Sequence, residues 1–189
     1  GDYQPDRNQT PLLVGNYLHS FFESEDAHKK FLEDNKKALY KYGNPDKGIK
    51  RDFLLADNYI NALKNDDGFN ALYQGEKEVI VKGDIDGVKW MGKIDCLDLD
   101  HKRFYDLKTV DDIHKKHWSE DLHQYVDFTI ARGYDTQMAI YKELIKQTFG
   151  VDCDPYIIAV SKQEVPDKAV NAFDDDDLRN ALNDVRMRQ

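Results

Sequence analysis

Two aspartates and a lysine stand close together near the middle of the chain, in a stretch whose pattern favours two paired strands. Apolar residues at 94–97 and 104–107 flank a short polar segment, which is typical of strands joined by a tight turn. Asp95 lies in the first of these strands and Asp106 in the second, with Lys108 two residues later. Because side chains alternate between the faces of a strand, Asp106 and Lys108 should project from the same face. Pairing of the strands would then bring Asp95 close to Asp106.

Such a group could bind a divalent cation. Two neighbouring carboxylates repel each other, and a bound cation is the usual remedy. The alternative is a solvated hairpin with a surface Asp–Lys pair, because an Asp-x-Lys triplet is unspecific: Asp34 and Asp100 begin two others in this chain. The triplet at Asp106 differs from these because it lies in a strand-like run that follows a second acid-bearing strand. The spacing alone does not choose between the two interpretations.

The composition limits the classes of function. The chain has 189 residues, of which 40% are hydrophobic and 33% charged, as expected for a single globular domain with its own core. No run approaches the roughly 20 apolar residues of a membrane helix, so we expect no membrane association. The two cysteines, Cys96 and Cys153, are too few for a four-cysteine zinc or iron–sulfur site, and we expect two buried thiols in a reducing cytoplasm. Gly1 suggests a cloning remnant or an internal start.

The net charge of −9 argues against a protein that coats nucleic acid indiscriminately. It does not exclude a nuclease, because acids around a metal count in the total and basic residues can cluster locally. Segment 36–51 contains one basic cluster, for which a solvated surface is the preferred interpretation. Segment 101–117 contains another, with three histidines among its lysines and arginine.

Hydrophobic periodicity predicts a mainly helical part at 11–75, a core at 76–165 and a C-terminal helix within 166–189. The helical part should contain helices at 11–22, from Ser24 to Tyr42 with Ser24 as N-cap, and at 53–63, with a loop at 43–51 and a short helix or turn at 68–73. The core should contain an antiparallel meander of strands at 76–82, 88–98 and 103–110, a mobile loop at 111–120, a helical stretch at 122–149 with a candidate break at Gly133, and a central strand at 156–161. The final helix should begin at the acidic run 174–177, because the helix dipole favours acids at the N-terminus.

Four ordered motifs resemble those of the PD-(D/E)xK nuclease superfamily, and within it the RecB-like and RecE-like (exonuclease VIII type) branch of bacteria and phages. They are Gly15-x-x-x-His19, Gly92-x-x-Asp95, Asp106-Leu107-Lys108-Thr109 and Gly133-Tyr134-Asp135-x-Gln137-x-x-x-Tyr141. The strand at 156–161 with Lys162 is similar to the segment that follows the Gln/Tyr helix in that branch, so the resemblance covers about residues 12–165. It implies an α/β (mixed α+β) fold: a restriction-endonuclease-like core whose central mixed sheet is flanked by helices.

The resemblance also implies roles for individual residues. His19, Asp95, Asp106 and the backbone carbonyl of Leu107 would bind the metal. Lys108 would orient or activate the attacking water, or stabilise charge on the phosphate, while Gln137 and Tyr141 would position the phosphate or Lys108. Glu78 could bind a further metal ion, or form a surface salt bridge, which is the preferred interpretation for its rival Glu76.

The implied activity is that of a DNA exonuclease that uses Mg²⁺ or Mn²⁺, with His19 suiting Mn²⁺ better. A lysine beside the cation would have its ammonium form disfavoured. We expect a phage or prophage enzyme of recombination that acts on linear duplex DNA in the bacterial cytoplasm, supplies a single-strand annealing protein and assembles as a homo-oligomeric ring. The alternatives are a RecB-like endonuclease or CRISPR-associated-type nuclease without an iron–sulfur cluster, and a non-catalytic DNA-binding module. Residues 166–189 match no motif of the branch.

Overall fold

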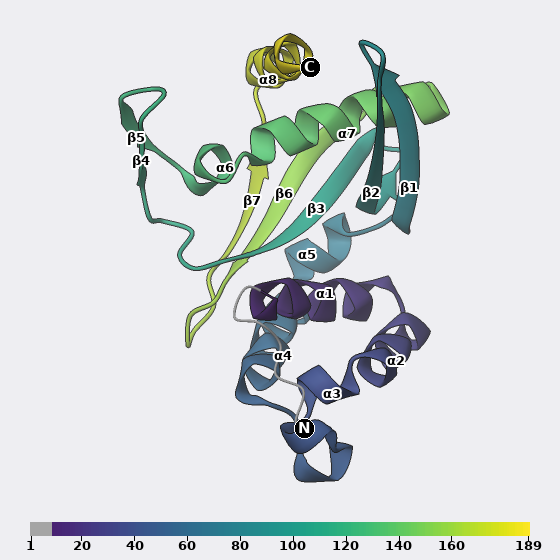
Figure 1. Ribbon diagram of the computed structural model, residues 1–189, viewed down its shortest axis with the longest axis vertical. Helices are drawn as coiled ribbons and strands as arrows, with labels where there is room; N and C mark the ends of the chain where they lie inside the picture. Colours follow the sequence, from purple (N-terminus) through teal and green to yellow (C-terminus); the bar gives the residue numbers. More distant parts are fainter. Residues whose placement is uncertain (1–8) are drawn as a thin grey trace.

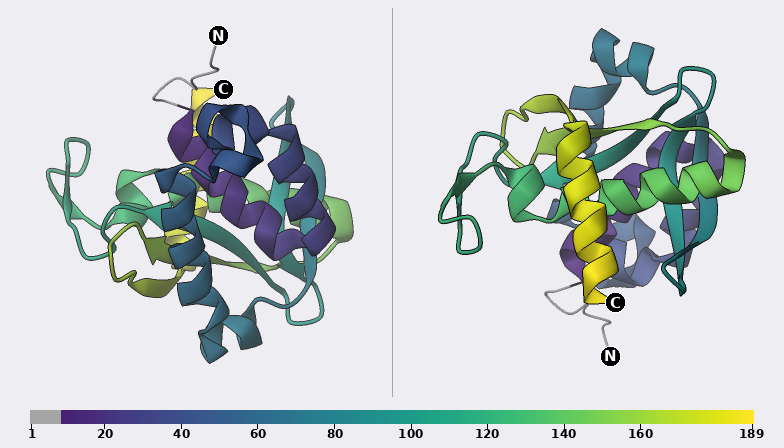
Figure 2. Two further views of the ribbon diagram at one scale, coloured as in Figure 1. Left: turned by 90° about the horizontal axis from the view of Figure 1, so that it is seen from below. Right: turned by 90° about the horizontal axis from the view of Figure 1, so that it is seen from above.

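A five-stranded mixed sheet separates two helical layers (Figures 1 and 2). The computed structural model describes residues 9–189. The N-terminal helices lie on one face of the sheet, while α7 (Tyr134–Phe149) covers the other face and α8 (Asp175–Arg188) packs against α7. This arrangement confirms the expected fold class, a central mixed sheet flanked by helices.

The strands follow the order β1-β2-β3-β6-β7 across the sheet. β1 (Glu76–Ile85), β2 (Val88–Asp98) and β3 (Arg103–Val110) are antiparallel neighbours, which confirms the predicted meander. The chain then crosses over through α7, and β6 (Asp154–Ser161) pairs parallel to β3 as an interior strand. β7 (Lys168–Ala172) pairs with β6 at the edge and was not predicted. Its exposure alternates and it is short and polar, so it carries little hydrophobic signal.

The turn between β1 and β2 is tighter than predicted. β1 continues to Ile85, so Asp86 and Gly87 alone form the connection. Both residues have positive φ, at 50° and 87°, as a two-residue hairpin turn requires. The expected turn over 83–87 was therefore too long.

Five helices form the N-terminal layer, and their apolar faces pack on β3 and β6. The side chains of Leu18, Leu39, Phe53 and Leu63 are almost fully buried there. The helices are α1 (Thr10–Glu23), α2 (Glu25–Asp34), α3 (Lys36–Leu39), α4 (Arg51–Lys64) and α5 (Asp67–Leu72).

Local side-chain contacts set where α2 begins and ends. Ser24 accepts a hydrogen bond from the Ala27 N–H, which confirms it as the N-cap. The helix expected to reach Tyr42 is instead divided into α2, which ends at Asp34, and α3; between them the side-chain amide of Asn35 donates to the Phe31 carbonyl. Two short 3₁₀ helices follow α3: η1 (Lys41–Gly43) lies where the expected helix was to end, and η2 (Pro45–Lys47) lies in the expected loop.

The prediction of a loop is confirmed for 111–116 but was wrong for 117–126. The chain forms a hairpin of β4 (His117–Ser119) and β5 (Gln124–Val126) where a loop and the start of a helix were expected, and α6 (Phe128–Ala131) follows. Leu122 and Tyr125 are 54% and 69% exposed, so their spacing does not mark a buried helix face. The break at Gly133 is confirmed, because this residue has a φ of 70° and immediately precedes α7.

Two further predictions are confirmed by burial and capping. Cys96 and Cys153 are both free and buried, and burial raises the pKa of each thiol to about 11. Asp174 caps α8 by accepting a hydrogen bond from the Asp176 N–H, so the acidic run starts a helix. Of the helices between residues 9 and 189, none combines the length and the apolar character needed to cross a membrane.

Candidate active site

Two cavities meet between α1 and the sheet and form one groove. The larger, about 800 Å³, lies between α1, α2, the first three strands and α7; the smaller, about 580 Å³, lies between α1, the end of β3 and the start of α7. Both are lined by Leu12, Asn16, His19 and Lys108. Because His19 comes from α1 and Lys108 from β3, the groove follows the boundary between the N-terminal layer and the sheet.

β2 and β3 separate at the two aspartates. Their backbone pairing ends at Cys96 and Tyr105, one position before Asp95 and Asp106 would face each other. At this point the Leu107 N–H donates a 2.7 Å hydrogen bond to Asp95 Oδ2. The carboxylate thus takes the place of a strand partner and satisfies a buried backbone donor. Asp95 and Asp106 are only 6% and 4% exposed.

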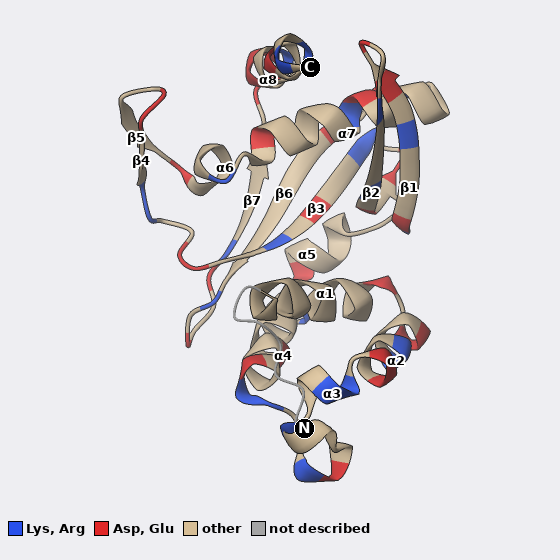
Figure 3. Cartoon of the chain, in the orientation of Figure 1, with Lys and Arg blue, Asp and Glu red and all other residues tan. Residues whose placement is uncertain are grey.

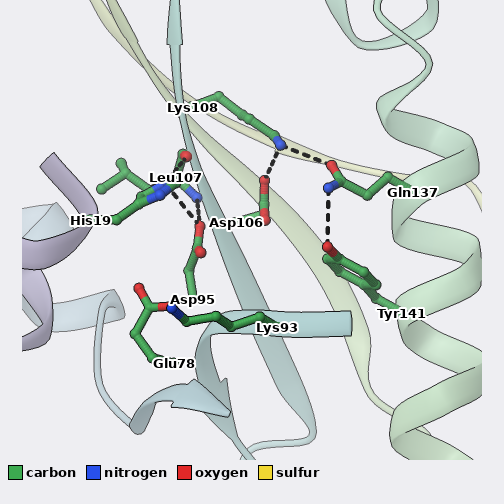
Figure 4. Close-up of polar contacts among 9 residues, drawn as sticks. All are labelled: His19, Glu78, Lys93, Asp95, Asp106, Leu107, Lys108, Gln137 and Tyr141. Atoms are coloured by element: carbon green, nitrogen blue, oxygen red, sulfur yellow. Dashed lines mark hydrogen bonds and ion pairs between the residues drawn. The ribbon is translucent and has the colours of Figure 1, made fainter. Parts of the chain in front are cut away.

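His19 reaches the same point from α1. Its Nε2 atom lies 2.8 Å from the Leu107 carbonyl oxygen and 3.3 Å from Asp95 Oδ2. Both backbone groups of Leu107 therefore contact side chains of the site (Figure 4). The structure brings together three of the predicted metal ligands: His19, Asp95 and the Leu107 carbonyl.

Asp106 and Lys108 project from the same face of β3, as predicted. The Lys108 Nζ atom lies 2.8 Å from Asp106 Oδ2, but the contact lacks hydrogen-bond geometry, so among the described residues this buried oxygen has no hydrogen-bond donor. Lys108 donates a 2.8 Å hydrogen bond to Gln137 Oε1, and Gln137 Nε2 donates to the Tyr141 hydroxyl at 3.2 Å (Figure 4). Gln137 thus holds Lys108 by a hydrogen bond, and Tyr141 in turn holds Gln137.

The electrostatics of the site favour a bound cation. Burial raises the pKa of Asp95 well above its usual value, and the charge of Asp106 raises it further. Burial also acts to lower the pKa of Lys108, but attraction by Asp106 outweighs it and the pKa is raised. Lys108 is therefore an ammonium here. The expected destabilisation of its ammonium form would arise only with a metal cation bound beside it.

Glu78 lies next to these residues, at a point where the backbone of β1 is distorted. Lys77 pairs with Cys96 and Val79 with Ile94, so Glu78 stands opposite Asp95, and its φ is 56°. A left-handed conformation in a non-glycine residue costs on the order of 1–3 kcal/mol and is commonly found at functional sites.

The side chain of Glu78 is buried and lines the larger cavity. It is 9% exposed and lies 3.4 Å from Lys93 Nζ, and burial raises its pKa. It thus forms a salt bridge but not on the surface, and its binding of a further metal ion stays a prediction. Glu76 is exposed and is absent from the described lining of both cavities.

The donor set fits a hard divalent cation. Two buried carboxylates and a carbonyl offer the oxygen ligands that Mg²⁺ prefers, and Mg²⁺ keeps several waters, so few protein ligands suffice. The separations of His19 Nε2 from the two nearby oxygens are close to the distance of about 3 Å between neighbouring ligands of an octahedral ion bound at about 2.1 Å. Within residues 9–189, no three His, Cys, Asp or Glu side chains are placed so that they could hold a metal ion together. A cation here would therefore also need the Leu107 carbonyl and water or substrate oxygens as ligands.

Sequence reasoning missed two neighbours of the site. Lys93 lines the larger cavity and pairs with Glu78; it lies two residues before Asp95, a spacing that could have identified it. Tyr134 places its ring 4.6 Å from Lys108 Nζ, a cation–π contact. The three histidines of the second basic cluster are absent from the described lining of both cavities. His101, for example, contacts Asp98 in its own turn.

Gly92 allows the Tyr141 ring to lie directly on β2. A Cβ atom at Gly92 would meet Tyr141 Cε1 at 2.6 Å and Cδ1 at 2.8 Å. We predict that Gly92→Ala lowers the free energy of unfolding by about 1–3 kcal/mol through this overlap, measured by urea denaturation.

Two controls separate overlap from backbone effects. A methyl group at Gly15 in α1 would have no atom within 4 Å, so Gly15→Ala should be neutral or stabilising by up to about 1 kcal/mol. In a Tyr141→Ala background the cost of Gly92→Ala should largely disappear. An equal cost in both backgrounds would show that Tyr141 is not the cause.

Comparisons with known proteins agree with this geometry. The chain matches, over residues 1–189, the family described as "PDDEXK-like domain of unknown function (DUF3799)". The structure is similar to the crystal structure of a protein described as "Putative exonuclease" from Eubacterium rectale, with a TM-score of 0.86 and 32% sequence identity. The match covers 97% of this chain and 66% of the Eubacterium rectale chain. Among curated proteins there is no match.

The family match and the structural similarity confirm the resemblance to the PD-(D/E)xK nuclease superfamily and the restriction-endonuclease-like fold that it implied. The chain belongs to the PDDEXK-like family DUF3799, within the PD-(D/E)xK nuclease superfamily.

Proposed function

We propose that this protein is a divalent-metal-dependent DNA exonuclease. The observation that carries the proposal is the convergence of two buried carboxylates, a histidine and a lysine in one open groove of a PDDEXK-like domain. The Eubacterium rectale protein, described as a "Putative exonuclease", supports the choice of exonuclease over endonuclease. This chain spans 66% of that protein, so the activity of the longer protein is itself part of the proposal.

The chemistry of the donor set suits phosphodiester hydrolysis. A phosphodiester resists attack by hydroxide because it is anionic. Mg²⁺ or Mn²⁺ held by Asp95, Asp106 and the Leu107 carbonyl, with His19 beside them, would neutralise that charge and lower the pKa of bound water. The buried position of the carboxylates strengthens their interaction with the cation, because less water competes for it.

The remaining side chains of the site position the lysine. Lys108, as an ammonium, would donate to a phosphate oxygen and stabilise the negative charge that grows there during attack. Gln137 accepts a hydrogen bond from Lys108, and Tyr141 fixes the Gln137 amide through its hydroxyl. Gln137 and Tyr141 are therefore positioning residues for Lys108 in this proposal.

We place the protein in the exonuclease VIII type branch, acting on linear duplex DNA during phage or prophage recombination. A single-strand annealing protein would take up the product, and a homo-oligomeric ring would keep the enzyme on its substrate. The support for this placement is the set of motifs at His19, Asp95, Asp106 and Gln137, together with the similarity to the Eubacterium rectale protein.

The proposed activity is tested with linear and covalently closed circular duplex DNA. With Mg²⁺ or Mn²⁺, we expect degradation of the linear DNA from its ends and no cutting of the circle, followed on gels with labelled ends. Cutting of the circle would identify an endonuclease instead. Absence of cleavage with either ion, together with DNA binding that Asp106→Ala leaves unchanged, would identify a non-catalytic binding module.

We predict that Lys108→Ala lowers kcat by about 10²–10⁴-fold, because the ammonium no longer stabilises the reacting phosphate. Metal affinity, measured by calorimetry, should be retained because Lys108 is not a ligand. Lys89→Ala is the matched control, since Lys89 is an exposed lysine on β2. A cleavage rate equal to that of the wild type would exclude the role given to Lys108.

His19→Ala should weaken Mn²⁺ binding by at least about tenfold, because even outer-shell partners of metal ligands are worth that much. Calorimetric titration of the apo protein with Mn²⁺ measures the change. His101→Ala serves as the control, because its ring contacts Asp98 in the β2–β3 turn. If the two variants bind Mn²⁺ equally well, His19 is a structural residue that holds the Leu107 carbonyl.

A further inference from the structure

The two cavities of the groove differ in charge. We call the larger one the acidic arm and the smaller one the basic arm. The three lysines that line the acidic arm each pair with a carboxylate: Lys30 with Asp34, Lys93 with Glu78 and Lys108 with Asp106. Its lining also contains the carboxylates of Glu23 and Asp95. The acidic arm therefore has more carboxylates than lysines.

The basic arm has the opposite balance. Lys108, Arg132 and Lys162 line it, with Asp111 as the acidic residue of its described lining. Arg132 lies 4.0 Å from Asp111, and both side chains are more than half exposed, so this pair is weak. For Lys162, the described part of the chain supplies no carboxylate within ion-pair distance. Arg132 and Lys162 are thus largely available to a ligand.

Both cations are fixed to elements that also carry the candidate active site. The Lys162 N–H donates a 2.7 Å hydrogen bond to the Val110 carbonyl at the end of β3, two residues after Lys108. Arg132 immediately precedes Gly133, from which α7 starts and carries Gln137 to Lys108. The basic arm is therefore a continuation of the site, because Lys108 and His19 line both arms.

We propose that Arg132 and Lys162 bind the backbone phosphate next to the scissile one, so that the polynucleotide strand lies in the basic arm and the cleaved end lies in the acidic arm. The inference rests on the proposed nuclease function. A polyanionic strand binds where cations are in excess, and an arm in which carboxylates outnumber lysines disfavours a continuing backbone. The basic arm, at about 580 Å³, is within the size range of ligand sites.

The first test measures DNA binding without cleavage. Fluorescein-labelled single-stranded oligonucleotide is titrated in EDTA with the wild type, with Arg132→Gln/Lys162→Gln and with Lys82→Gln/Lys89→Gln. The control pair changes the charge equally but lies on the β1–β2 hairpin. We expect the first variant to bind on the order of tenfold more weakly, as for removal of charge-assisted hydrogen bonds. Its slope of log Kd against log salt should fall by about 0.7 for each phosphate that is no longer neutralised, and the control should match the wild type.

The second test locates the phosphate. A single uncharged methylphosphonate is placed next to the cut, either on the polynucleotide side or on the cleaved-end side, and release of the first nucleotide is followed with Mg²⁺ or Mn²⁺. On the polynucleotide side it should raise KM for the wild type and have little effect on Arg132→Gln/Lys162→Gln, because that variant already lacks the cations that bind this phosphate. A methylphosphonate on the cleaved-end side should change KM equally for the wild type and for Arg132→Gln/Lys162→Gln.

The outcomes distinguish this inference from the proposed function. If the wild type cleaves DNA but the double variant equals it in Kd, salt slope and KM, or if the coupling is found on the cleaved-end side, the assignment of Arg132 and Lys162 is overturned while the nuclease function stands. If the wild type cleaves no DNA with either ion, the proposed function fails, and the binding titration still reports whether the basic arm holds a phosphate.

Discussion

The backbone of Leu107, through its N–H and its C=O, is the point on which the site and the fold both depend. It is buried where β2 and β3 separate, so neither its N–H nor its C=O can rely on a strand partner there. Asp95 accepts from the N–H and His19 contacts the C=O. A buried donor without a partner costs about 1–3 kcal/mol, so these side chains stabilise the junction of α1, β2 and β3. The same contacts fix the positions of the groups that would bind a cation, which couples the geometry of the site to the packing of the N-terminal layer.

The other wall of the site depends on how closely α7 approaches the sheet. Gly92 leaves space for the Tyr141 ring, and Gly83 leaves space for Gln147 and Leu144 further along the helix. With α7 at this distance, Gln137 can accept from Lys108 directly. Lys108 therefore lies between an acidic partner on its own strand and an amide on the helix. That arrangement holds a long, flexible side chain in one direction and keeps it protonated, which a group that acts on a phosphate requires.

The sequence predicted the arrangement of the candidate site residues better than it predicted the exposed segments of the chain. Alternation of faces along β3 was sufficient to place Asp106 beside Lys108, because β3 is regular. Alternation was not sufficient to place Asp95. Ile94 and Leu97 both pack in the core on the α7 side, so the alternation of faces along β2 breaks near Asp95. Glu78, with its left-handed backbone, lies opposite this point. Such a distortion depends on tertiary contacts that no local pattern encodes. The hairpin at 117–126 was missed for a different reason, since apolar spacing predicts a helix only where the apolar residues are buried.

An acidic protein can bind a polyanion when its cations are concentrated in one part of the surface. Figure 3 shows acidic and basic residues spread over both layers, while α1, which forms one side of the groove, is almost free of charge. The net charge of −9 is therefore a poor guide to the groove, where charge is set by the few residues that line each arm. A cation bound at the junction would offset the carboxylates that are placed there to hold it. The excess of cations in the lining of the basic arm then favours entry of a strand along that arm.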